Sequence, residues 1–248
     1  MRIDKYLASK FGSRTKAAQA IERGLVLVNG EIVNPSYDTD GSDDFTFSEA
    51  RENYVSLGGF KLGKAIRDFG FDADGKVFAD IGASTGGFTD CLLQNGAKKV
   101  YCIDVGENQL DSSLADKNIV SIENFNARNL NKSLFSEPLD GVVIDVSFIS
   151  LTYILDKVAS VLDSGKHVIA LIKPQFECEN KNVGKNGIVK DARVREKIIA
   201  KIYNFALKCG LAPLKLTTAP QVKGKNLEFL MLFEKDGKPT NLDQIKLL

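Results

Sequence analysis

The stretch Asp80–Gly106, DIGASTGGFTDCLLQNGAKKVYCIDVG, decides the fold of this chain. An apolar run ending in DIG is followed by a glycine-rich turn, a helical segment and a second apolar run that ends in Asp104. This order is typical of a strand–helix–strand unit in an open α/β sheet. Ligands of such sheets bind at the carboxyl ends of the strands, beside the point where the strand order reverses. The sequence therefore predicts a ligand site at the turn that follows Asp80.

From about residue 60 onward, helical and apolar strand-like segments alternate. Strands are expected at residues 76–82, 99–106, 118–124, 140–148, 166–174, 212–218 and 227–234. Helices are expected around Leu62–Phe69, Phe88–Asn95, Leu151–Leu162 and Arg193–Gly210. Such alternation predicts right-handed crossovers and a mostly parallel, Rossmann-like sheet. No helical pattern separates the last two strands, so we expect them to form an antiparallel hairpin at the edge of the sheet.

The composition indicates a folded cytoplasmic protein. Of 248 residues, 44% are hydrophobic, which is enough for a sizeable core. The N-terminal stretch 1–16 carries charges where a signal peptide needs an apolar run, and no segment approaches the roughly 18 apolar residues of a membrane span. We therefore expect a cytoplasmic location and no membrane partner.

The cysteines and the single histidine do not indicate a metal site. The four cysteines are widely scattered and form no CxxC pair: Cys91, Cys102, Cys178 and Cys209. Disulfides and a structural zinc are therefore not expected. His167 lies inside an apolar run and is either a general base or a packed strand residue. We favour the packed residue.

The first 48 residues are predicted to form a small separate domain, joined by a linker at 49–59 to a larger domain at 60–248. Apolar spacing predicts two short helices between Asp4 and Ile21, broken at GSRTK. The segment LVLVNGEIV then predicts a hairpin, because the pair Asn29-Gly30 is favoured in tight hairpin turns.

This N-terminal pattern resembles the small RNA-binding domain named after ribosomal small-subunit protein four. The matching stretches are RIDKYLA and SRTKAAQAIERGLVLVNG. The resemblance implies binding of structured RNA by shape, with basic side chains on the phosphates. The residues carried over are Arg2, Arg14, Lys16 and Arg23. The alternative is a solvated basic helix face.

The glycine turn suits a nucleoside better than a dinucleotide. A nicotinamide-binding turn follows the pattern G-x-G-x-x-G, whereas this chain has Gly82, Ser84 and Gly87 and lacks the second glycine. Asp104 ends the next strand, where a carboxylate accepts hydrogen bonds from ribose hydroxyls. A ligand with a ribose but no phosphate fits S-adenosylmethionine, whose sulfonium tolerates a nearby carboxylate. A tight turn without a ligand, or a dehydrogenase with an altered turn, remain the alternatives.

The residues expected to hold this cofactor lie in the turn and after the next two strands. They are Asp80, Gly82, Ala83, Ser84, Gly86, Gly87, Asp104 and Asn126. Asn126 follows the third strand and either bonds the adenine or only caps a turn.

Four charged residues interrupt apolar runs: Lys61, Asp145, Lys173 and Glu228. A charge at the end of an apolar strand is unfavourable unless it is paired or used chemically. Asp145 and Lys173 end neighbouring predicted strands, so we expect the group to share one rim of the sheet.

The chain from about Tyr54 to its end resembles the TlyA family, whose catalytic domain has the FtsJ-type methyltransferase fold. The most telling stretches are DIGASTGGFTD, IDVSFISL and IKPQFE. The resemblance implies a Rossmann-like S-adenosylmethionine-dependent methyltransferase sheet with an antiparallel edge hairpin, preceded by a small α+β RNA-binding domain. It implies methyl transfer to the 2′-oxygen of a cytidine ribose in ribosomal RNA, without a metal. The family's catalytic tetrad falls on Lys61, Asp145, Lys173 and Glu228.

The chemistry assigns a role to each of these residues. We expect Lys173 to activate the 2′-hydroxyl, Asp145 to hold that lysine, and Glu228 to orient Lys61 or the substrate. Lys64 lies one helical turn from Lys61 and is the alternative to it.

Two departures from the family pattern affect this expectation. Leu57 stands where the family has arginine, and the loop before Glu228 carries Lys223 and Lys225 where glycines are usual.

Two other classes of function are alternatives to the enzyme. A non-catalytic RNA-binding factor of ribosome assembly would not need the four charged positions. A haemolysin or cytolysin, a label that some family members carry, would need an amphipathic or long apolar segment, and the sequence shows none. We therefore favour the enzyme acting on ribosomal RNA or ribosomal subunits.

Overall fold

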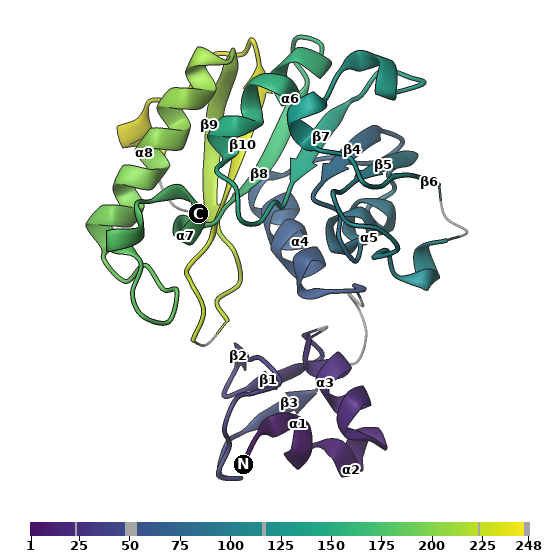
Figure 1. Cartoon of the computed structure of the whole chain (residues 1–248), viewed down its shortest axis with the longest axis vertical. Helices are drawn as coiled ribbons and strands as arrows, with labels where there is room; N and C mark the ends of the chain where they lie inside the picture. Colours follow the sequence, from purple (N-terminus) through teal and green to yellow (C-terminus); the bar gives the residue numbers. More distant parts are fainter. Residues whose placement is uncertain (23, 48–53, 116–117, 223, 246–248) are drawn as a thin grey trace.

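The computed structural model describes residues 1–22, 24–47, 54–115, 118–222 and 224–245. It contains a small N-terminal domain and a larger α/β domain (Figure 1). Arg23, Lys223 and the first five residues of the expected linker, 49–53, fall outside the described residues. The last three residues of that linker, 57–59, form the first turn of a helix.

The N-terminal domain packs three short helices against a three-stranded sheet. The helices are α1 (Ile3–Tyr6), α2 (Ala8–Phe11) and α3 (Arg14–Glu22), and the strands are β1 (Val26–Val28), β2 (Glu31–Ile32) and β3 (Phe45–Phe47) in the order β2-β1-β3. The predicted hairpin is present, with Asn29 and Gly30 at φ 52° and 78°. The first predicted helix is divided into α1 and α2 at Leu7, and β3 pairs antiparallel with β1 although no strand was predicted there.

The larger domain is built on a seven-stranded sheet in the order β6-β5-β4-β7-β8-β10-β9. Its strands are β4 (Val77–Ile81), β5 (Lys99–Ile103), β6 (Ile119–Ile122), β7 (Gly141–Ile144), β8 (His167–Ile172), β9 (Leu211–Thr218) and β10 (Phe229–Lys235). The first five are parallel, and β10 runs antiparallel to both β8 and β9. All seven predicted strands and the edge hairpin are therefore confirmed. The strand order reverses between β4 and β7, which predicts the ligand site there.

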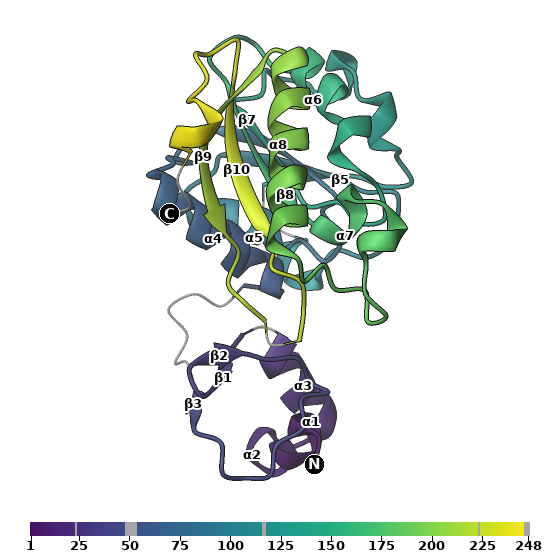
Figure 2. The ribbon, with the colours of Figure 1, turned by 90° about the vertical axis from the view of Figure 1, so that its left-hand side faces the viewer.

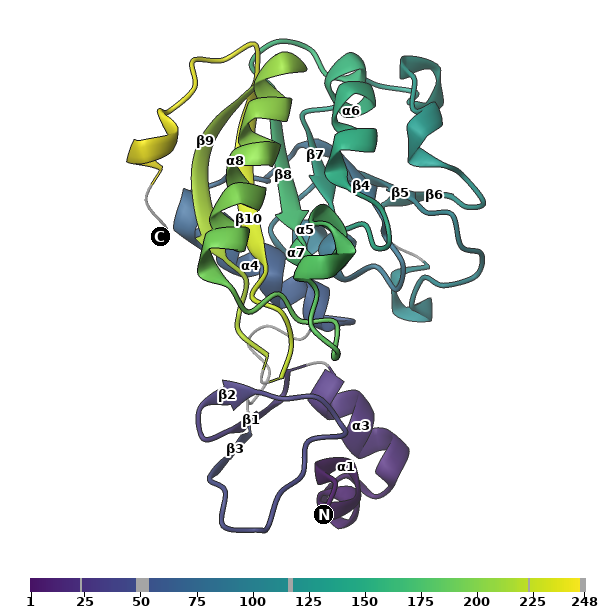
Figure 3. The same ribbon diagram turned by 60° about the vertical axis from the view of Figure 1, so that its left-hand side comes forward.

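Helices cover both faces of this sheet (Figures 2 and 3). They are α4 (Leu57–Phe69), α5 (Gly87–Gln94), α6 (Leu155–Val161), α7 (Pro174–Glu177) and α8 (Ala192–Lys208). Apolar residues of α4 and α5 pack in one core, and those of α6 and α8 pack in another. Helix α7 was not predicted. Helix α4 begins five residues before its predicted start, and Gly59 in its first turn lies against Tyr54, whose Cγ would be 2.2 Å from a Cβ at that position.

Within the described parts of the chain, the two domains contact each other through the loop between β9 and β10 and through α4. Ile32 forms an isolated parallel bridge with Val222 in the loop between β9 and β10. Gly24 lies against α4, because a Cβ added to it would be 3.1 Å from the ring of Phe60 and 3.3 Å from Leu57. Leu57, where the resemblance leads us to expect arginine, thus lies at the contact with the N-terminal domain.

His167 begins β8, and its ring lies edge-on to Phe71 with centroids 5.9 Å apart, as expected of a packed strand residue. Burial lowers the pKa of His167. Among the described residues, no helix combines the length and apolar character required to cross a membrane.

Candidate active site

The glycine turn brings the ends of three strands together. Gly82 follows β4 with φ 82°, and its N–H donates to Ile103 O of β5 at 2.8 Å. A Cβ on Gly82 would be 2.4 Å from the carbonyl oxygen of Asp145, which follows β7. The turn therefore needs glycine both for its left-handed backbone and for this close approach.

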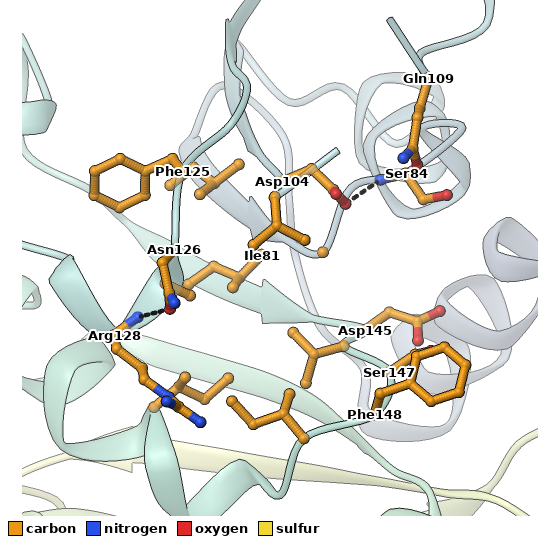
Figure 4. A pocket seen from close by; sticks show the side chains of 17 residues that line it. Ile81, Ser84, Asp104, Gln109, Phe125, Asn126, Arg128, Asp145, Ser147 and Phe148 are labelled. Atoms are coloured by element: carbon orange, nitrogen blue, oxygen red, sulfur yellow. Dashed lines mark hydrogen bonds between the residues drawn. The ribbon is translucent and has the colours of Figure 1, made fainter. Parts of the chain in front are cut away.

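A cavity of about 570 Å³ opens at these strand ends (Figure 4). Its volume is in the range of sites for drug-sized ligands. Apolar side chains form much of the wall, with Asp104, Asn126 and Asp145 among the polar groups. The apolar lining includes Ile81, Ile103, Phe125, Ile149 and Ile154.

Asp104 is fixed at the end of β5 by two backbone amides. Its Oδ2 accepts from Ser84 N at 2.9 Å, and its Oδ1 accepts from Gly106 N at 2.7 Å. A carboxylate offers about four lone-pair directions, so both oxygens retain acceptor capacity. The geometry suits the two hydroxyls of a ribose.

Asn126 both caps a short helical turn and lines the cavity. Its Oδ1 accepts from Arg128 N at 3.0 Å at the start of the 3₁₀ turn Ala127–Asn129. The cap fixes the side chain through its oxygen, and Asn126 comes from the loop that follows β6 (Figure 4). The structure therefore shows the capping role, and a contact with adenine stays a prediction.

Asp80 lies behind the wall of the cavity. Its side chain is 0% exposed, and its Oδ2 accepts from Thr89 Oγ1 at 2.7 Å. Burial raises the pKa of Asp80 to about 7, and the charges of Asp145 and Asp104 add to the rise. The position supports the turn from inside the domain and does not offer direct contact with a ligand.

The remaining residues of the turn divide between two roles. Ala83 and Gly87 line a second, smaller cavity of about 180 Å³, together with Ser56 and Lys173. This cavity shares Gly82, Ser84, Asp145 and Ser147 with the larger one, so the two adjoin. Gly86 instead packs inward, since a Cβ there would be 2.3 Å from Leu114.

The four charged residues predicted to act together form two ion pairs. Lys173 Nζ lies 2.5 Å from Asp145 Oδ1, and it also donates to Ser147 Oγ at 2.8 Å. Lys61 Nζ of α4 lies 2.7 Å from Glu228 Oε2. All four side chains are largely buried, with 12–19% of their surface exposed. The register that pairs Phe229 with Ile172 places Glu228 and Lys173 at the same edge of the sheet.

The charge of Lys61 links the two pairs. Burial alone would lower the pKa of Lys61, but the Asp145 and Glu228 carboxylates outweigh it and hold that pKa above its ordinary value. Lys61 is therefore a cation at neutral pH. Lys64, the alternative considered from the sequence, instead contacts Asp68 of its own helix and Thr217 Oγ1 at 2.7 Å. It does not join the tetrad.

Three polar or aromatic residues of the site did not emerge from the sequence. Ser147 contacts Lys173, as described above. Phe148 is 91% exposed, has φ 63° and lies with its ring centroid 5.1 Å from that of Phe176. Glu177 is buried and accepts from Ser150 Oγ at 2.5 Å and Leu151 N at 2.7 Å, which fixes the segment after β7. Their only sequence signal is their place in IDVSFISL and IKPQFE.

Two of the predicted RNA-binding arginines of the N-terminal domain form ion pairs with the same acidic residue. Arg2 Nη2 and Arg14 Nε lie 2.8 and 3.1 Å from Asp4 Oδ2, and Asp4 is only 3% exposed. Each guanidinium remains about half exposed. Lys16 is exposed on α3, whereas Arg23 lies outside the described residues. Asp4 thus orients two cations on one surface.

Comparison with known proteins agrees with both domains. Residues 54–235 match the family of FtsJ-like methyltransferases, and residues 1–45 match the S4 domain. The chain is 43% identical to hemolysin A of Brachyspira hyodysenteriae over 94% of this chain and 99% of that one. It is 34% identical to the 16S/23S rRNA (cytidine-2′-O)-methyltransferase TlyA of Mycobacterium tuberculosis, over 84% of this chain and 79% of that one.

Solved structures include one described as a hemolysin from Streptococcus thermophilus. It is 37% identical, and the match covers 99% of this chain and 94% of that one with a TM-score of 0.76. The likeness therefore extends over both domains.

Proposed function

This chain belongs to the family of FtsJ-like methyltransferases, and from that premise we propose that it methylates the 2′-oxygen of a cytidine ribose in ribosomal RNA. S-adenosylmethionine is the proposed methyl donor. The observation that carries the proposal is the Lys173–Asp145 pair at 2.5 Å, which borders a cavity of nucleoside size. The relative from Mycobacterium tuberculosis, named for the same reaction, supports the choice of substrate.

The larger cavity fits the proposed donor. Asp104 is placed to accept from the ribose hydroxyls, and Asn126 to bond the adenine between apolar walls. The carboxylate of Asp145 borders both cavities and favours a cation nearby. When bound, S-adenosylmethionine supplies an electrophilic methyl group attached to a sulfonium.

Lys173 and Asp145 make the acceptor hydroxyl reactive. The ammonium of Lys173 stabilises the negative charge that develops on the 2′-oxygen, and the Asp145 carboxylate receives the proton. Ser147 holds the lysine from a second direction. Because these groups are largely buried, their electrostatic effect exceeds what the same charges would have in water.

Lys61 supplies a second positive charge beside this pair, and Glu228 holds the Lys61 ammonium in position. Since Lys61 stays protonated, it serves as a second cation near the reacting oxygen and not as a base. Glu228 restrains its ammonium group at 2.7 Å. This arrangement keeps Lys61 oriented before the substrate arrives.

In this proposal the N-terminal domain binds the RNA, and an aromatic residue at the cavity stacks against the target nucleotide. Arg2, Arg14 and Lys16 supply charges for phosphates. Phe148 offers an exposed ring beside Ser147, and a nucleotide withdrawn from its stack can pack on such a ring. We propose a cytoplasmic location, because the proposed substrate is ribosomal RNA.

Mass spectrometry of the RNA tests this function directly. The purified protein is incubated with 16S and 23S rRNA, and with ribosomal subunits, in the presence of isotope-labelled S-adenosylmethionine. We expect labelled 2′-O-methylcytidine. Binding of rRNA and donor without any labelled nucleoside would instead favour the non-catalytic assembly factor. Lysis of erythrocytes without RNA methylation would favour the cytolysin, and calorimetric binding of NAD in place of the donor would favour a dehydrogenase.

A further inference from the structure

Two loops that leave the catalytic edge of the sheet are joined side by side. One loop is residues 180–190, between α7 and α8, and the other is residues 219–222 and 224–227, between β9 and β10 (Figures 1 and 3). Asn226 connects them: its Oδ1 accepts from Val189 N at 2.8 Å, and its Nδ2 donates to Gly187 O at 2.8 Å. The two loops therefore behave as one structural unit.

The first loop has a defined shape. Gly187 N donates to Gly184 O at 2.8 Å, which closes a tight turn with Lys185 and Asn186 at its tip. Arg195 of α8 donates to the carbonyls of Val189 and Lys190 at 3.0 and 2.8 Å. The backbone around Lys185 and Lys190 is thus held from both sides, so both lysines project from an ordered backbone.

The two loops carry three exposed lysines, which we call the lysine ridge: Lys185, Lys190 and Lys225. Lys185 lies two residues from Gly187 and Lys190 one residue from Val189, both of which bond Asn226, and Lys225 directly precedes Asn226. Lys181 also lies in the first loop but pairs with Glu179 at 2.6 Å, so we leave it out of the ridge. The segment 180–197 holds six basic residues, Lys181, Lys185, Lys190, Arg193, Arg195 and Lys197, against Asp191 and Glu196. The surface is locally positive in a chain of net charge +1.

The ridge lies between the N-terminal domain and the tetrad. Val222 of the second loop bridges to Ile32 of the N-terminal domain, and Glu228 follows Asn226 by two residues. A polyanion held by the N-terminal domain and reaching Lys173 would pass this surface. The apolar residues of both loops, Val183, Ile188, Val189, Val222 and Leu227, are buried or half-buried. The unit therefore offers charge, and not an apolar face that would enter a lipid layer.

We propose that the lysine ridge is a second RNA-binding surface. It binds phosphates of the RNA strand where that strand runs from the N-terminal domain to the catalytic tetrad. The proposal rests on the proposed function for the identity of its ligand. Each lysine that neutralises a phosphate releases counterions, so binding acquires a dependence on salt of about 0.7 to 0.9 in logarithmic slope per contact. The role is positional and sequence-independent.

Salt-dependent binding of the full chain tests the ridge. The probe is 23S or 16S rRNA, and the dissociation constant is measured between about 0.05 and 0.3 M KCl. The triple variant K185Q/K190Q/K225Q is expected to bind roughly tenfold or more weakly at physiological salt, with a slope reduced by about two to three. The triple variant K185R/K190R/K225R keeps the charges and is expected to bind as the wild type does.

A matched control removes three lysines from the opposite edge of the sheet. Its substitutions are K98Q, K208Q and K238Q, which precede β5, end α8 and follow β10. Lys98 lies 2.9 Å from Glu137, which keeps Lys99 as a partner in the variant. We expect no change of slope in this control. Thermal unfolding of all three variants shows whether they fold. If the glutamine triple variant is unstable, the single variants K185Q, K190Q and K225Q test the ridge, each with an expected reduction of the slope by about one.

The outcomes separate clearly. An unchanged slope in a folded glutamine variant, or an equal loss in the control, overturns the proposal. So does a variant that binds rRNA normally but loses binding to phosphatidylglycerol vesicles, since the ridge would then serve a membrane. The assay needs no methyl transfer, so wild-type protein that binds rRNA through the ridge without methylating it would refute the proposed function alone.

Discussion

Lys173 and Asp145 lie at the carboxyl ends of the neighbouring parallel strands β8 and β7, with Nζ and Oδ1 2.5 Å apart. Two features of the sequence produce this pair. Each residue ends a run of buried apolar side chains, and parallel strands bring their carboxyl ends to one edge. Gly82 lets the turn after β4 approach the backbone of Asp145, which places the cavity of about 570 Å³ directly beside the pair.

Lys61 and Lys64 provide a matched pair of substitutions on one helix. Lys61→Ala removes a cation from the tetrad, and we expect kcat to fall roughly 10- to 100-fold. Lys64→Ala removes a lysine that contacts Asp68 and Thr217 instead, so kcat should stay within about twofold. Steady-state methylation of rRNA measures both. Equal losses in the two variants would contradict the placement of Lys61.

Asp104 sets the affinity for the donor. Asp104→Ala removes the acceptor proposed for the ribose hydroxyls, and we expect the dissociation constant of S-adenosylmethionine to rise about 10- to 100-fold. Asp104→Asn retains one acceptor oxygen and should have a smaller effect. Calorimetry in the absence of RNA is the measurement. Wild-type affinity in the alanine variant would place the ribose elsewhere.

Phe148 is expected to act on the RNA and not on stability. Base–aromatic stacking contributes about 1–3 kcal/mol, so Phe148→Ala should lower kcat/KM for rRNA roughly 5- to 150-fold. Phe148→Tyr keeps a ring and should restore most of the activity. Since the side chain is 91% exposed, the melting temperature of either variant should change little. A normal kcat/KM for the alanine variant would remove Phe148 from the acceptor site.

Asp80 makes stability depend on pH. Burial holds the pKa of Asp80 in the folded state at about 7, above its ordinary value of 3.8. The folded state therefore binds the proton more tightly than the unfolded state. The stabilisation is complete below the unfolded pKa and is lost as pH rises through about 7. Asp80→Asn should remove this decline of the free energy of unfolding between pH 5 and pH 8.

Urea unfolding at several pH values measures the effect of Asp80→Asn. Asp140→Asn is the control, because the pKa of Asp140 is shifted in the opposite direction. The Lys166 ammonium lies 2.7 Å from Asp140, and despite the opposing effect of burial the pKa of Asp140 is lowered. Its contribution is present above the unfolded pKa and is lost as pH falls. A wild-type pH profile in Asp80→Asn would mean that another group titrates in this range.

The sheet of the catalytic domain could be predicted because buried parallel strands are continuous apolar runs. Each of the seven runs became a strand, and the hairpin of β9 and β10 followed from the missing helical pattern. Helix α7 was missed because it has only four residues and begins at Pro174. Strand β3 was missed because three residues carry too little periodicity, and it is stabilised by contacts distant in sequence, the pairing with β1 and the packing of Phe45 and Phe47 against the core.

The charged members of the site were visible because they end apolar runs, but their contacts were not. The pairing of Arg2 and Arg14 with Asp4 depends on the fold of the N-terminal domain. An aspartate before a glycine turn looks the same whether it faces a ligand or the interior, so the burial of Asp80 could not be foreseen. Glu177 reaches Ser150 across 27 positions of sequence, a distance at which no local pattern exists.

The rate of methyl transfer in a single turnover by Lys173→Ala tests the catalytic role of the Lys173–Asp145 pair most directly. With saturating rRNA and S-adenosylmethionine, we predict a fall of about 10²- to 10⁴-fold, while calorimetry shows donor binding within about twofold of wild type. A Lys173→Ala protein that folds, binds the donor and methylates rRNA at the wild-type rate would contradict it.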